Sequence, residues 1–499
     1  MDARRSPELL RLADAVLAPG FVGTTPPDWV RRRLAGGLGG VVLYGRNIEN
    51  AAQVAALTAA LRAERPDVIV ATDEEAGDVT RLETAVGSSR PGNLALGVVD
   101  DPDVTEEVAR DLGRELAAAG ITLNYAPTVD VNSNPENPVV GARSFGADPS
   151  LVSRHSAAWV RGLQATGVAA CAKHFPGHGA TEADSHESLP VVLAPAEELE
   201  KISLPPFRAA IEAGVRAVMT GHLLVPAYDP ARPATLSTRI LTDLLRTGLG
   251  FTGVVVTDGI EMASVTKHLG IAAAAVRALA AGADTICVGG EFAGEGVAVL
   301  LRDSIADAVE AGLLAEERLA EAAGRVGALA AWTAAHRAAP EPAASNGLGV
   351  AVARRALRLT ATVGAPALPL TVPPHVVELA AHTNMAVDPR TPWGLAAPLA
   401  ALLPGTTSVR IGADSADGLP GALEGGRGRP VVLVVRDAHR LPWVSAALGR
   451  LLDTRPDAIV VEMGVPGPER PGAVHLATHG ASRACALAAA DLLAGGPAG

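Results

Sequence analysis

The sequence predicts an α/β protein in which a (β/α)8 barrel of the TIM type is followed by a smaller α/β sandwich domain. Short, continuous apolar runs alternate with Ala- and Leu-rich helical stretches, and eight such runs occur before residue 291. Strands that are apolar throughout and alternate with helices are typical of a parallel sheet covered on both faces. Eight of them within about 330 residues suit a barrel with insertions. The alternation resumes after a stretch rich in Pro, Ala and Ser, which predicts the second domain.

The expected elements follow from these runs in chain order. The barrel strands are expected near residues 16–22, 39–45, 67–74, 121–128, 168–175, 217–224, 253–259 and 284–290. Helices are expected at 102–119, 150–166, 196–214, 238–248 and 270–281, with a helical tail at 295–336. Strands of the second domain are expected at 408–413, 430–438, 457–464 and 473–480, before a closing helix. The resulting domain boundaries are 1–338 for the barrel, 339–349 for the linker and 350–499 for the C-terminal α/β domain.

Composition excludes several classes of protein. The chain has 499 residues, of which 48% are hydrophobic and 19% charged, which is typical of a globular protein with room for two domains. The net charge of −12 argues against a nucleic-acid partner or an anionic membrane. Residues 1–20 predict an amphipathic helix rather than a signal peptide, and no apolar run has the length of a membrane span. We therefore expect a cytoplasmic protein with neither a nucleic-acid nor a membrane partner.

Polar residues stand where the predicted barrel strands end. Five of the eight strands have such side chains at or after their C-terminal ends: Asp73, Asp130 with Arg143, Lys173 with His174, His222, and Asp258. The C-terminal ends of barrel strands share one face, and the active sites of such barrels lie there. Packing alone does not require so many polar side chains at one edge. The pattern therefore predicts a shared active site.

One segment of this edge is unusually rich in reactive side chains. Residues 171–190, CAKHFPGHGATEADSHESLP, hold three histidines, a lysine and an aspartate, together with glycine and proline residues that forbid a regular helix. His174 and His178 have the four-residue spacing of a helical metal pair. Pro176 and Gly177 interrupt any helix there, however, and no third ligand is placed. We therefore expect no metal and no cofactor, and we expect His178 to brace the loop.

Four segments carry a resemblance to a known family. Residues 173–186, KHFPGHGATEADSH, resemble the signature of the β-N-acetylglucosaminidases of glycoside hydrolase family three. The same family is resembled by NYAPTVDVNSNPENPVVGARSFG (124–146), VMTGHLLVPAYDPARPATLS (218–237) and GFTGVVVTDGIEM (250–262). The resemblance covers roughly residues 10–335. The Lys-His…Asp-Ser-His segment is specific within the family, because family-three β-glucosidases lack it.

Retaining glycoside hydrolysis needs a carboxylate nucleophile and an acid about 5 Å apart. Asp258 suits the nucleophile because a strand-like run, GVVVT, holds it and Gly259 lets the backbone turn away; the resemblance implies the same role. The resemblance also implies that Asp184 and His186 form the acid/base pair in place of a second carboxylate. An aspartate that binds one imidazole nitrogen fixes the tautomer and raises the basicity of the other nitrogen. A histidine titrates near neutral pH, so it can donate a proton and then take one from water.

The resemblance further implies which residues contact the sugar. They are Asp73, Arg81, Arg143, Lys173, His174 and His222. Asp73, Lys173 and His174 would bind ring hydroxyls, and the two arginines would lie at the periphery of the sugar.

The sequence departs from the family near the first of these residues. The family's usual Asp-x-Glu-Gly-Gly stands here as Asp73-Glu74-Glu75-Ala76-Gly77, and Asp78 replaces a residue that is commonly basic or polar. Only glycine adopts positive φ angles at little energetic cost, so Ala76 restricts the backbone conformations that this turn can adopt. The departure affects the expected contacts of Arg81 more than those of Asp73.

These features together predict a retaining, exo-acting β-N-acetylglucosaminidase that forms a covalent glycosyl-aspartate intermediate. The expected partner is an oligosaccharide that carries N-acetylglucosamine, such as a recycled cell-wall (peptidoglycan) fragment or a chito-oligosaccharide. A β-N-acetylglucosaminide phosphorylase with the same site is the first alternative. A β-glucosidase and an inactive sugar-binding protein are further alternatives, although Asp258 and His186 are both present.

Overall fold

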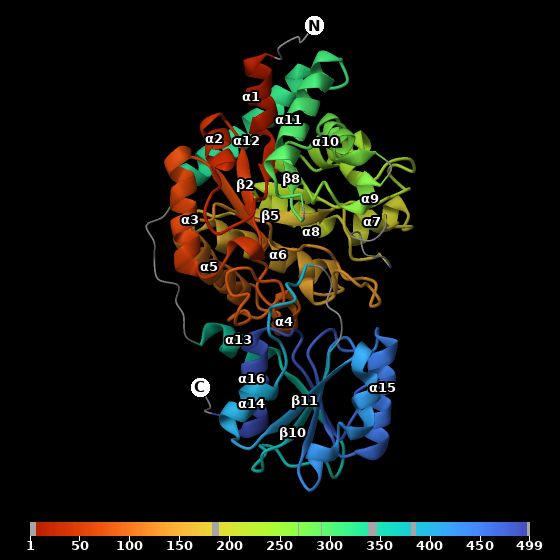
Figure 1. The fold of residues 1–499 in the computed structure, drawn as a ribbon. Coiled ribbons are helices and arrows are strands. Elements are labelled where there is room, and N and C mark those ends of the chain that lie inside the picture. Colours follow the sequence, from red (N-terminus) through yellow and green to blue (C-terminus); the bar gives the residue numbers. More distant parts are fainter. Residues whose placement is uncertain are drawn as a thin grey trace. The chain divides into compact units, whose positions relative to one another are not determined.

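The structure is a computed structural model that describes residues 6–181, 189–267, 269–290, 292–337, 347–380 and 386–496. The chain forms two compact units, and Figure 1 colours them along the sequence. The barrel unit consists of Met1–Glu74, Thr105–Val140 and Ala147–Ala344. The C-terminal unit consists of Glu75–Val104, Gly141–Gly146 and Ser345–Gly499.

The strands of the barrel unit run parallel in chain order, which confirms the predicted barrel. They are β1 (Leu17–Pro19), β2 (Gly40–Leu43), β3 (Ile69–Thr72), β4 (Leu123–Asn124), β5 (Ala169–Phe175), β6 (Ala217–Thr220), β7 (Val254–Thr257) and β8 (Ile286–Val288). β2 to β7 form one sheet, and β1 pairs with β8. Single bridges, Gly20 to Val42 and Val256 to Thr285, connect β1 to β2 and β7 to β8. Each strand lies inside the apolar run that predicted it.

Helices separate these strands in the chain. They are α1 (Pro7–Ala15), α2 (Asp28–Ala35), α3 (Ala51–Glu64), α5 (Pro102–Ala118), α6 (Pro149–Gln164), α7 (Ala196–Ile202), α8 (Pro205–Glu212), the π-helical segment Arg239–Gly248, α9 (Ala263–Thr266), α10 (Gly270–Ala281), α11 (Glu295–Glu310) and α12 (Glu316–Ala335). The helix predicted at 196–214 is divided into α7 and α8. Pro205 and Pro206 explain the break, because neither has the backbone N–H that a continuous helix needs.

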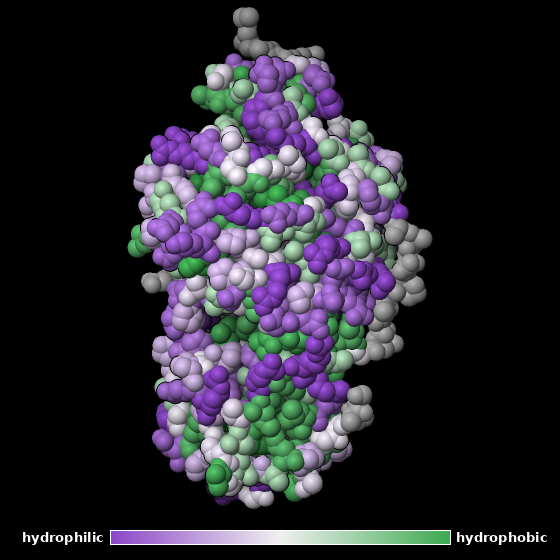
Figure 2. Space-filling view, turned by 180° about the vertical axis from the view of Figure 1, so that it is seen from behind, coloured by the Kyte–Doolittle hydropathy of each residue, from purple (hydrophilic) through white to green (hydrophobic). Residues whose placement is uncertain are grey.

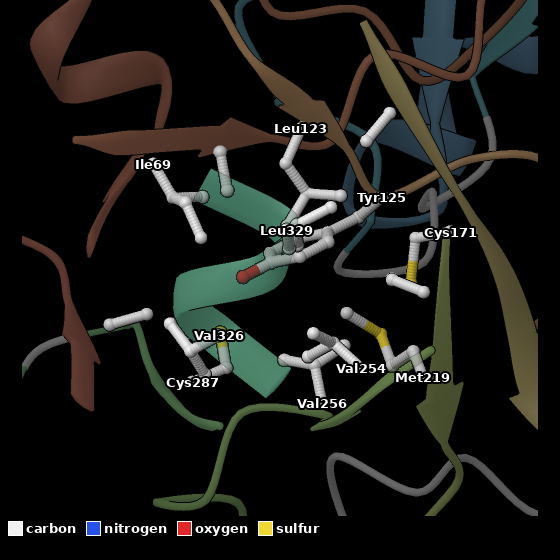
Figure 3. Packing of buried hydrophobic residues seen from close by; sticks show 14 of the residues in the cluster. Ile69, Leu123, Tyr125, Cys171, Met219, Val254, Val256, Cys287, Val326 and Leu329 are labelled. Carbon is white, nitrogen blue, oxygen red and sulfur yellow. The ribbon is translucent and has the colours of Figure 1, made fainter. Parts of the chain in front are cut away.

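Apolar side chains from the strands fill the barrel interior. Figure 3 shows this cluster, which includes Ile69, Leu123, Tyr125, Cys171, Met219, Val254, Val256, Cys287, Val326 and Leu329. The last two belong to α12, so this helix shares the barrel core. Side chains alternate across a strand, which is why one set points into the interior and the intervening set faces the surrounding helices. Burying them stabilises the barrel by about 25 cal/mol for each Å² of apolar surface removed from water.

The C-terminal unit is built on a six-stranded sheet in the order β11-β10-β12-β13-β14-β9, with β9 antiparallel to its neighbour. The strands are β9 (Arg358–Ala361), β10 (His375–Ala380), β11 (Thr407–Gly412), β12 (Val431–Val435), β13 (Ile459–Glu462) and β14 (Val474–Ala477). The helices are α4 (Asn93–Val99), α13 (Leu348–Ala356), α14 (Ala396–Leu402), α15 (Pro442–Thr454) and α16 (Arg483–Ala494). α14 and α16 pack on one face of the sheet and α15 on the other, so the predicted α/β domain is present.

Two strands of this sheet were not expected from the sequence. β10 contains Glu378, a charge inside an otherwise apolar run, and all four residues of β9 are exposed. The exposed β9 has no buried apolar face, and Glu378 interrupts the apolar run of β10, so neither shows the continuous apolar pattern of the barrel strands. The neighbouring elements of the sheet, and not the local pattern, explain why these residues form strands.

Segments that lie between barrel strands in the sequence are bonded into the C-terminal unit. Asp78 forms a buried ion pair with Arg436 and accepts a hydrogen bond from the backbone N–H of Ala481 at 2.7 Å. Glu83 pairs with Arg483 at 2.9 Å. The C-terminal unit is therefore assembled from separate stretches of the chain. The predicted linker, 339–349, lies largely outside the described residues, so the predicted domain boundaries stay a prediction.

The surface mixes hydrophilic and hydrophobic residues. Figure 2 shows hydrophilic side chains over most of the visible face, with hydrophobic side chains in smaller areas between them. Within the described residues, no helix combines the length and the apolar character that a membrane crossing requires.

Candidate active site

The strand ends of the barrel unit bring together two residues that the sequence analysis selected separately. Asp73 follows β3, and Lys173 lies near the end of β5. The Lys173 ammonium forms an ion pair with the Asp73 carboxylate, with Nζ and Oδ1 2.7 Å apart. Lys173 is only 2% exposed, and a buried charge is tolerated when it is paired and hydrogen-bonded. The pair therefore holds two polar groups at the predicted face of the barrel.

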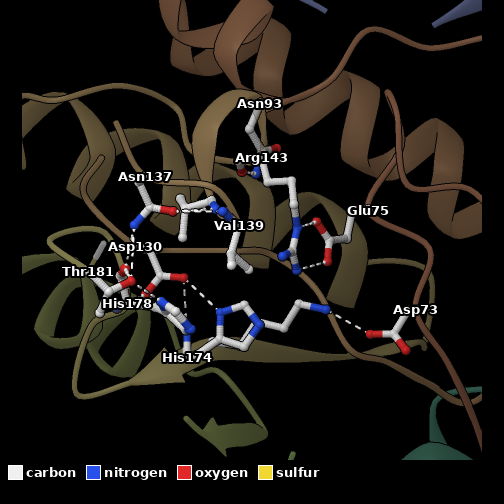
Figure 4. A network of polar contacts seen from close by, with 12 residues as sticks. Asp73, Glu75, Asn93, Asp130, Asn137, Val139, Arg143, His174, His178 and Thr181 are labelled. Carbon is white, nitrogen blue, oxygen red and sulfur yellow. Dashed lines mark hydrogen bonds and ion pairs between the residues drawn. The ribbon is translucent and has the colours of Figure 1, made fainter. Parts of the chain in front are cut away.

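One buried carboxylate, that of Asp130, fixes His174 and the backbone that follows it (Figure 4). Asp130 Oδ2 lies 2.7 Å from Nδ1 of His174, and Oδ1 accepts a 2.7 Å hydrogen bond from the backbone N–H of His178. Burial of Asp130 opposes its ionisation, but the charges and hydrogen bonds of the two histidines outweigh burial and lower the pKa of Asp130. The ionised carboxylate sets the tautomer and orientation of the His174 ring.

The sequence analysis placed Asp130 at a strand end without giving it a role. The available signal was an acidic residue between two valines, Val129 and Val131, just after the fourth expected strand. Asp130 is fully buried, and buried carboxylates are retained where they have partners. Its partners are 44 and 48 residues away in the chain, so only the fold reveals them.

The loop after β5 is anchored along its first residues. Nδ1 of His178 lies 2.8 Å from Oγ1 of Thr181, and the Asn137 side chain donates to the carbonyl oxygen of His178 at 2.8 Å. Only glycine fits at position 179, because a Cβ there would lie 1.7 Å from the carbonyl oxygen of Val131. These contacts support the bracing role expected of His178.

The predicted acid/base pair lies outside the described residues. Asp184 and His186 belong to the segment 182–188, which the structure does not describe. Their assignment stays a prediction.

Asp258 begins a tight turn that is bonded to the strands on both sides. Its backbone N–H donates to the carbonyl oxygen of Thr220 at 3.2 Å, and its Oδ1 accepts from the backbone N–H of Gly259 at 2.8 Å. Ile260 N–H donates to the carbonyl oxygen of Cys287 at 3.0 Å. The half-buried carboxylate is therefore carried by a turn that both β6 and β8 support. Such support holds a reactive group in one geometry.

His222 lies against the same turn. Its Nδ1 is 2.8 Å from Oγ1 of Thr235, and its Nε2 is 3.0 Å from the carbonyl oxygen of Gly259. A carbonyl oxygen can only accept, so Nε2 carries the proton. His222 is fully buried, and both ring nitrogens are engaged within the protein. Its predicted contact with the sugar stays a prediction.

The two predicted arginines belong to the C-terminal unit. Arg143 binds Glu75 in a bidentate ion pair, with Nε to Oε2 at 2.9 Å and Nη2 to Oε1 at 2.7 Å. Both side chains are less than 10% exposed, and Figure 4 shows the two parallel bonds. Arg81 donates to the carbonyl oxygen of Ala386 at 2.9 Å. A bidentate pair fixes the plane of the guanidinium, so Glu75 orients Arg143, a role that the sequence analysis did not assign.

The sequence departure at Ala76 has a direct structural counterpart. The φ angle of Ala76 is +63°, in the left-handed region where a Cβ costs about 1–2 kcal/mol. Gly77 follows with φ +61°, and a Cβ there would lie 2.5 Å from Cα of Gly92. The turn thus keeps a backbone shape suited to glycine although it carries one alanine.

Comparison with known sequences places this site in a family. Residues 28–329 match the glycosyl hydrolase family 3 N-terminal domain. Beta-hexosaminidase A of Pseudoalteromonas piscicida is 35% identical over 332 residues, which cover 61% of this chain and 55% of that protein. The chain thus matches about half the length of this relative. The beta-hexosaminidase of Pseudomonas aeruginosa (strain UCBPP-PA14) is 40% identical over 256 residues, 50% of this chain and 74% of that protein.

Solved structures extend the likeness over both units. A glycoside hydrolase family 3 beta-N-acetylglucosaminidase from Paenibacillus sp. str. FPU-7 has a TM-score of 0.86 at 34% identity, covering 98% of this chain and 97% of that one. The beta-glucoside phosphorylase BglX has a TM-score of 0.76 at 18% identity, covering 98% and 91%, a likeness of fold alone. The resemblance seen in the four sequence segments is confirmed, and the chain belongs to glycosyl hydrolase family 3.

Proposed function

We propose that this protein is a retaining, exo-acting β-N-acetylglucosaminidase that releases terminal N-acetylglucosamine from glycans through a covalent glycosyl-aspartate intermediate. The observation that carries the proposal is the likeness, over nearly the whole of both chains, to a family 3 beta-N-acetylglucosaminidase. The curated relatives named beta-hexosaminidase support the same substrate class. Cell-wall fragments and chito-oligosaccharides are the glycans that we expect it to act on.

Asp258 acts as the nucleophile in this proposal. Its carboxylate attacks the anomeric carbon, the bond from that carbon to the leaving oxygen breaks, and a glycosyl ester forms. A water molecule then attacks the same carbon and frees the carboxylate. The bonds that hold its turn to β6 and β8 support this role, because attack needs a fixed distance and direction.

His186, assisted by Asp184, protonates the leaving oxygen in the first step and takes a proton from water in the second. The described start of its loop supports the proposal indirectly. Asp130 fixes His174 and the backbone at His178, so the chain enters the catalytic segment from a rigid base.

The remaining predicted residues bind the substrate. Lys173 and Asp73, already paired at 2.7 Å, provide donors and acceptors for ring hydroxyls, and His174 provides a third oriented group. The contacts of Arg81 and Arg143 with the periphery of the sugar stay a prediction. We assign His222 to support of the Asp258 turn instead of sugar binding, because its two ring nitrogens bind Thr235 and Gly259.

Product analysis tests the proposal directly. An aryl β-N-acetylglucosaminide is incubated in phosphate-free buffer, and the first-formed sugar is examined by NMR. We expect free N-acetylglucosamine, initially as the β-anomer, because two inversions at one carbon retain its configuration. Initial α-anomer, or no turnover at all, would refute the assignment. A second incubation at millimolar phosphate identifies the acceptor, since N-acetylglucosamine 1-phosphate as the main product would make the protein a phosphorylase.

A further inference from the structure

Glu261, three residues after Asp258, lies in a cradle at the end of β8. Its Oε1 accepts a 3.0 Å hydrogen bond from the backbone N–H of Gly289. A Cβ added at Gly259, Gly289 or Gly290 would lie 3.1, 3.2 or 3.1 Å from Oε1. A side chain at any of these three positions would crowd the Glu261 carboxylate. The absence of side chains at the three glycines therefore leaves the space that the carboxylate occupies. Within the described part of the chain, its Oε2 is buried and has no hydrogen-bond partner.

One of these glycines, Gly290, is also bonded from the segment after β2. Arg46, which follows β2, donates to the carbonyl oxygen of Gly290 at 2.7 Å and to that of Phe21 at 3.0 Å. Glu261 binds the N–H of Gly289 and Arg46 binds the carbonyl oxygen of Gly290. The end of β8 is therefore attached both to the turn after β7 and to the segment after β2.

Glu261 also faces several charged and titratable groups. Burial raises its pKa, and the negative charge of Asp258 raises it further, whereas Arg46 opposes the shift. Tyr44 and Cys287 face the same carboxylate, and their own pKa values are raised chiefly by burial and then by nearby groups that include Glu261. Asp258 and Glu261 are thus close enough for one charge to act on the other.

His222 holds the opposite side of this turn. It binds the carbonyl oxygen of Gly259 from β6, while Glu261 binds Gly289 of β8. The turn that carries Asp258 is therefore held on both sides, by the His222 side chain that follows β6 and by its own Glu261 side chain bound at the end of β8, in addition to its backbone bonds. Neither contact was expected from the sequence.

We propose that Glu261 is a positioning residue for Asp258: its Oε1 holds the turn 258–262 against the end of β8. The proposal rests on the proposed function, in which Asp258 attacks the anomeric carbon. Glu261 itself touches no substrate in this account. It acts by keeping the distance and direction of attack, where a displacement of about 1 Å can cost on the order of 100-fold in rate.

Two substitutions test the hydrogen bond from Gly289 N–H to Glu261. Glu261→Ala removes it, and we expect kcat to fall roughly 10- to 100-fold with KM within about 3-fold of wild type. Glu261→Gln keeps an oxygen that can accept from Gly289 N–H, so kcat should stay within about 3-fold. Exposed Glu310, changed to Ala and to Gln, is the matched control.

The comparison of variants decides the proposal. An alanine variant within about 3-fold of wild-type kcat would overturn it, and so would a glutamine variant as impaired as the alanine variant. Asp258→Asn is measured alongside: if that variant keeps near-normal activity, the proposed function fails, whatever the Glu261 variants show. Thermal unfolding of each variant confirms that the folded protein is compared.

Discussion

The parallel strands of both sheets carry charged residues toward their carboxyl ends, but these residues have different partners. In the C-terminal sheet, Glu462 ends β13 and its two oxygens accept hydrogen bonds from the backbone N–H groups of Asp437, Ala438 and Gly464, at 2.8, 3.1 and 2.8 Å. Glu378 of β10 accepts likewise from the backbone of Leu395 at 2.8 Å and also pairs with the exposed Arg410 of the neighbouring strand β11 at 2.6 Å. The backbone bonds of these carboxylates satisfy the turns around them, which is a structural role.

In the barrel sheet, charged side chains bind one another across strands. Lys173 pairs with Asp73, and His174 pairs with Asp130. Such pairs hold charged groups in defined positions at one edge, as a binding or catalytic site requires. A charge at a strand end is therefore a weak sign of function by itself. The partners of that charge and their burial are more informative: the barrel edge pairs buried Lys173 with Asp73 and buried His174 with buried Asp130, whereas backbone turns hold Glu462.

Among the substitutions that test this comparison, Asp258→Asn should have the largest effect on activity. An amide cannot form the glycosyl ester, so we expect kcat to fall by several orders of magnitude with little change in stability. A 5-fluoro glycosyl donor should label Asp258 in the wild type, and mass spectrometry of peptides locates the label. Exposed Asp243, changed to Asn, is the control and should keep full activity. Near-normal turnover of Asp258→Asn would remove the functional distinction between the sheets.

His186→Ala should lose on the order of 10²–10⁴ in rate on substrates with poor leaving groups. The loss should be much smaller for activated aryl glycosides, because their leaving groups need little protonation. A series of aryl glycosides with leaving groups of different acidity measures this dependence, and Asp184→Asn should show it in milder form. Exposed His336, changed to Ala, serves as control. An equal loss on all substrates would make His186 a binding or structural residue.

Asp130→Asn should have an intermediate effect on both activity and stability. An asparagine oxygen cannot replace both carboxylate oxygens, so His174 or the backbone N–H of His178 loses its partner. Breaking a buried pair costs about 3–5 kcal/mol, and we expect kcat/KM to fall roughly 100-fold because His174 is no longer oriented. Urea unfolding and steady-state kinetics measure the two effects. Unchanged stability would show that Asp130 does not fix this part of the barrel.

Glu462→Gln should have the smallest effect on activity, because its partners are backbone groups of the C-terminal sheet. Its amide group would face a backbone N–H, which costs about 1–3 kcal/mol of stability. Burial and the charge of Asp437 raise the pKa of Glu462 to about 7. The folded state therefore binds this proton more tightly than the unfolded state does. The protonated carboxyl stabilises the folded state fully below about pH 4.5, and this stabilisation is lost as the pH rises through about 7.

Unfolding free energies measured across this pH range provide the readout for Glu462. The glutamine variant does not titrate, so this part of the pH dependence should disappear while kcat stays within about 2-fold of wild type. A large loss of kcat in a folded variant would show that strand-end carboxylates of the second sheet also serve the chemistry.

The sequence predicted the parts of the fold that local patterns determine. All eight barrel strands lie in continuous apolar runs, and α10 covers the expected residues 270–281. The elements that were missed or divided depend on features outside those patterns. β9 is exposed and forms because β14 pairs with it, and two prolines divide the helix expected at 196–214.

The same distinction holds for the candidate site. A charge at a strand end could be read from the sequence, so Asp73, Lys173 and Asp258 were identified before the structure. Partners from distant segments could not: Glu75 lies 68 residues from Arg143, and Asp130 lies 44 residues from His174. Their roles depend on how the chain returns to the same place, which no local pattern contains.

The composite C-terminal unit has a consequence for recombination of this gene with its relatives. A single crossover in the linker would exchange residues 345–499 and leave Asp78 and Glu83 behind, away from Arg436 and Arg483. A chain stopped near Pro342 would be deprived of the same partners. The exchangeable module consists of three pieces, 75–104, 141–146 and 345–499, and a functional chimera needs all three from one parent. Shuffling libraries should therefore yield active progeny mainly when these pieces are inherited together.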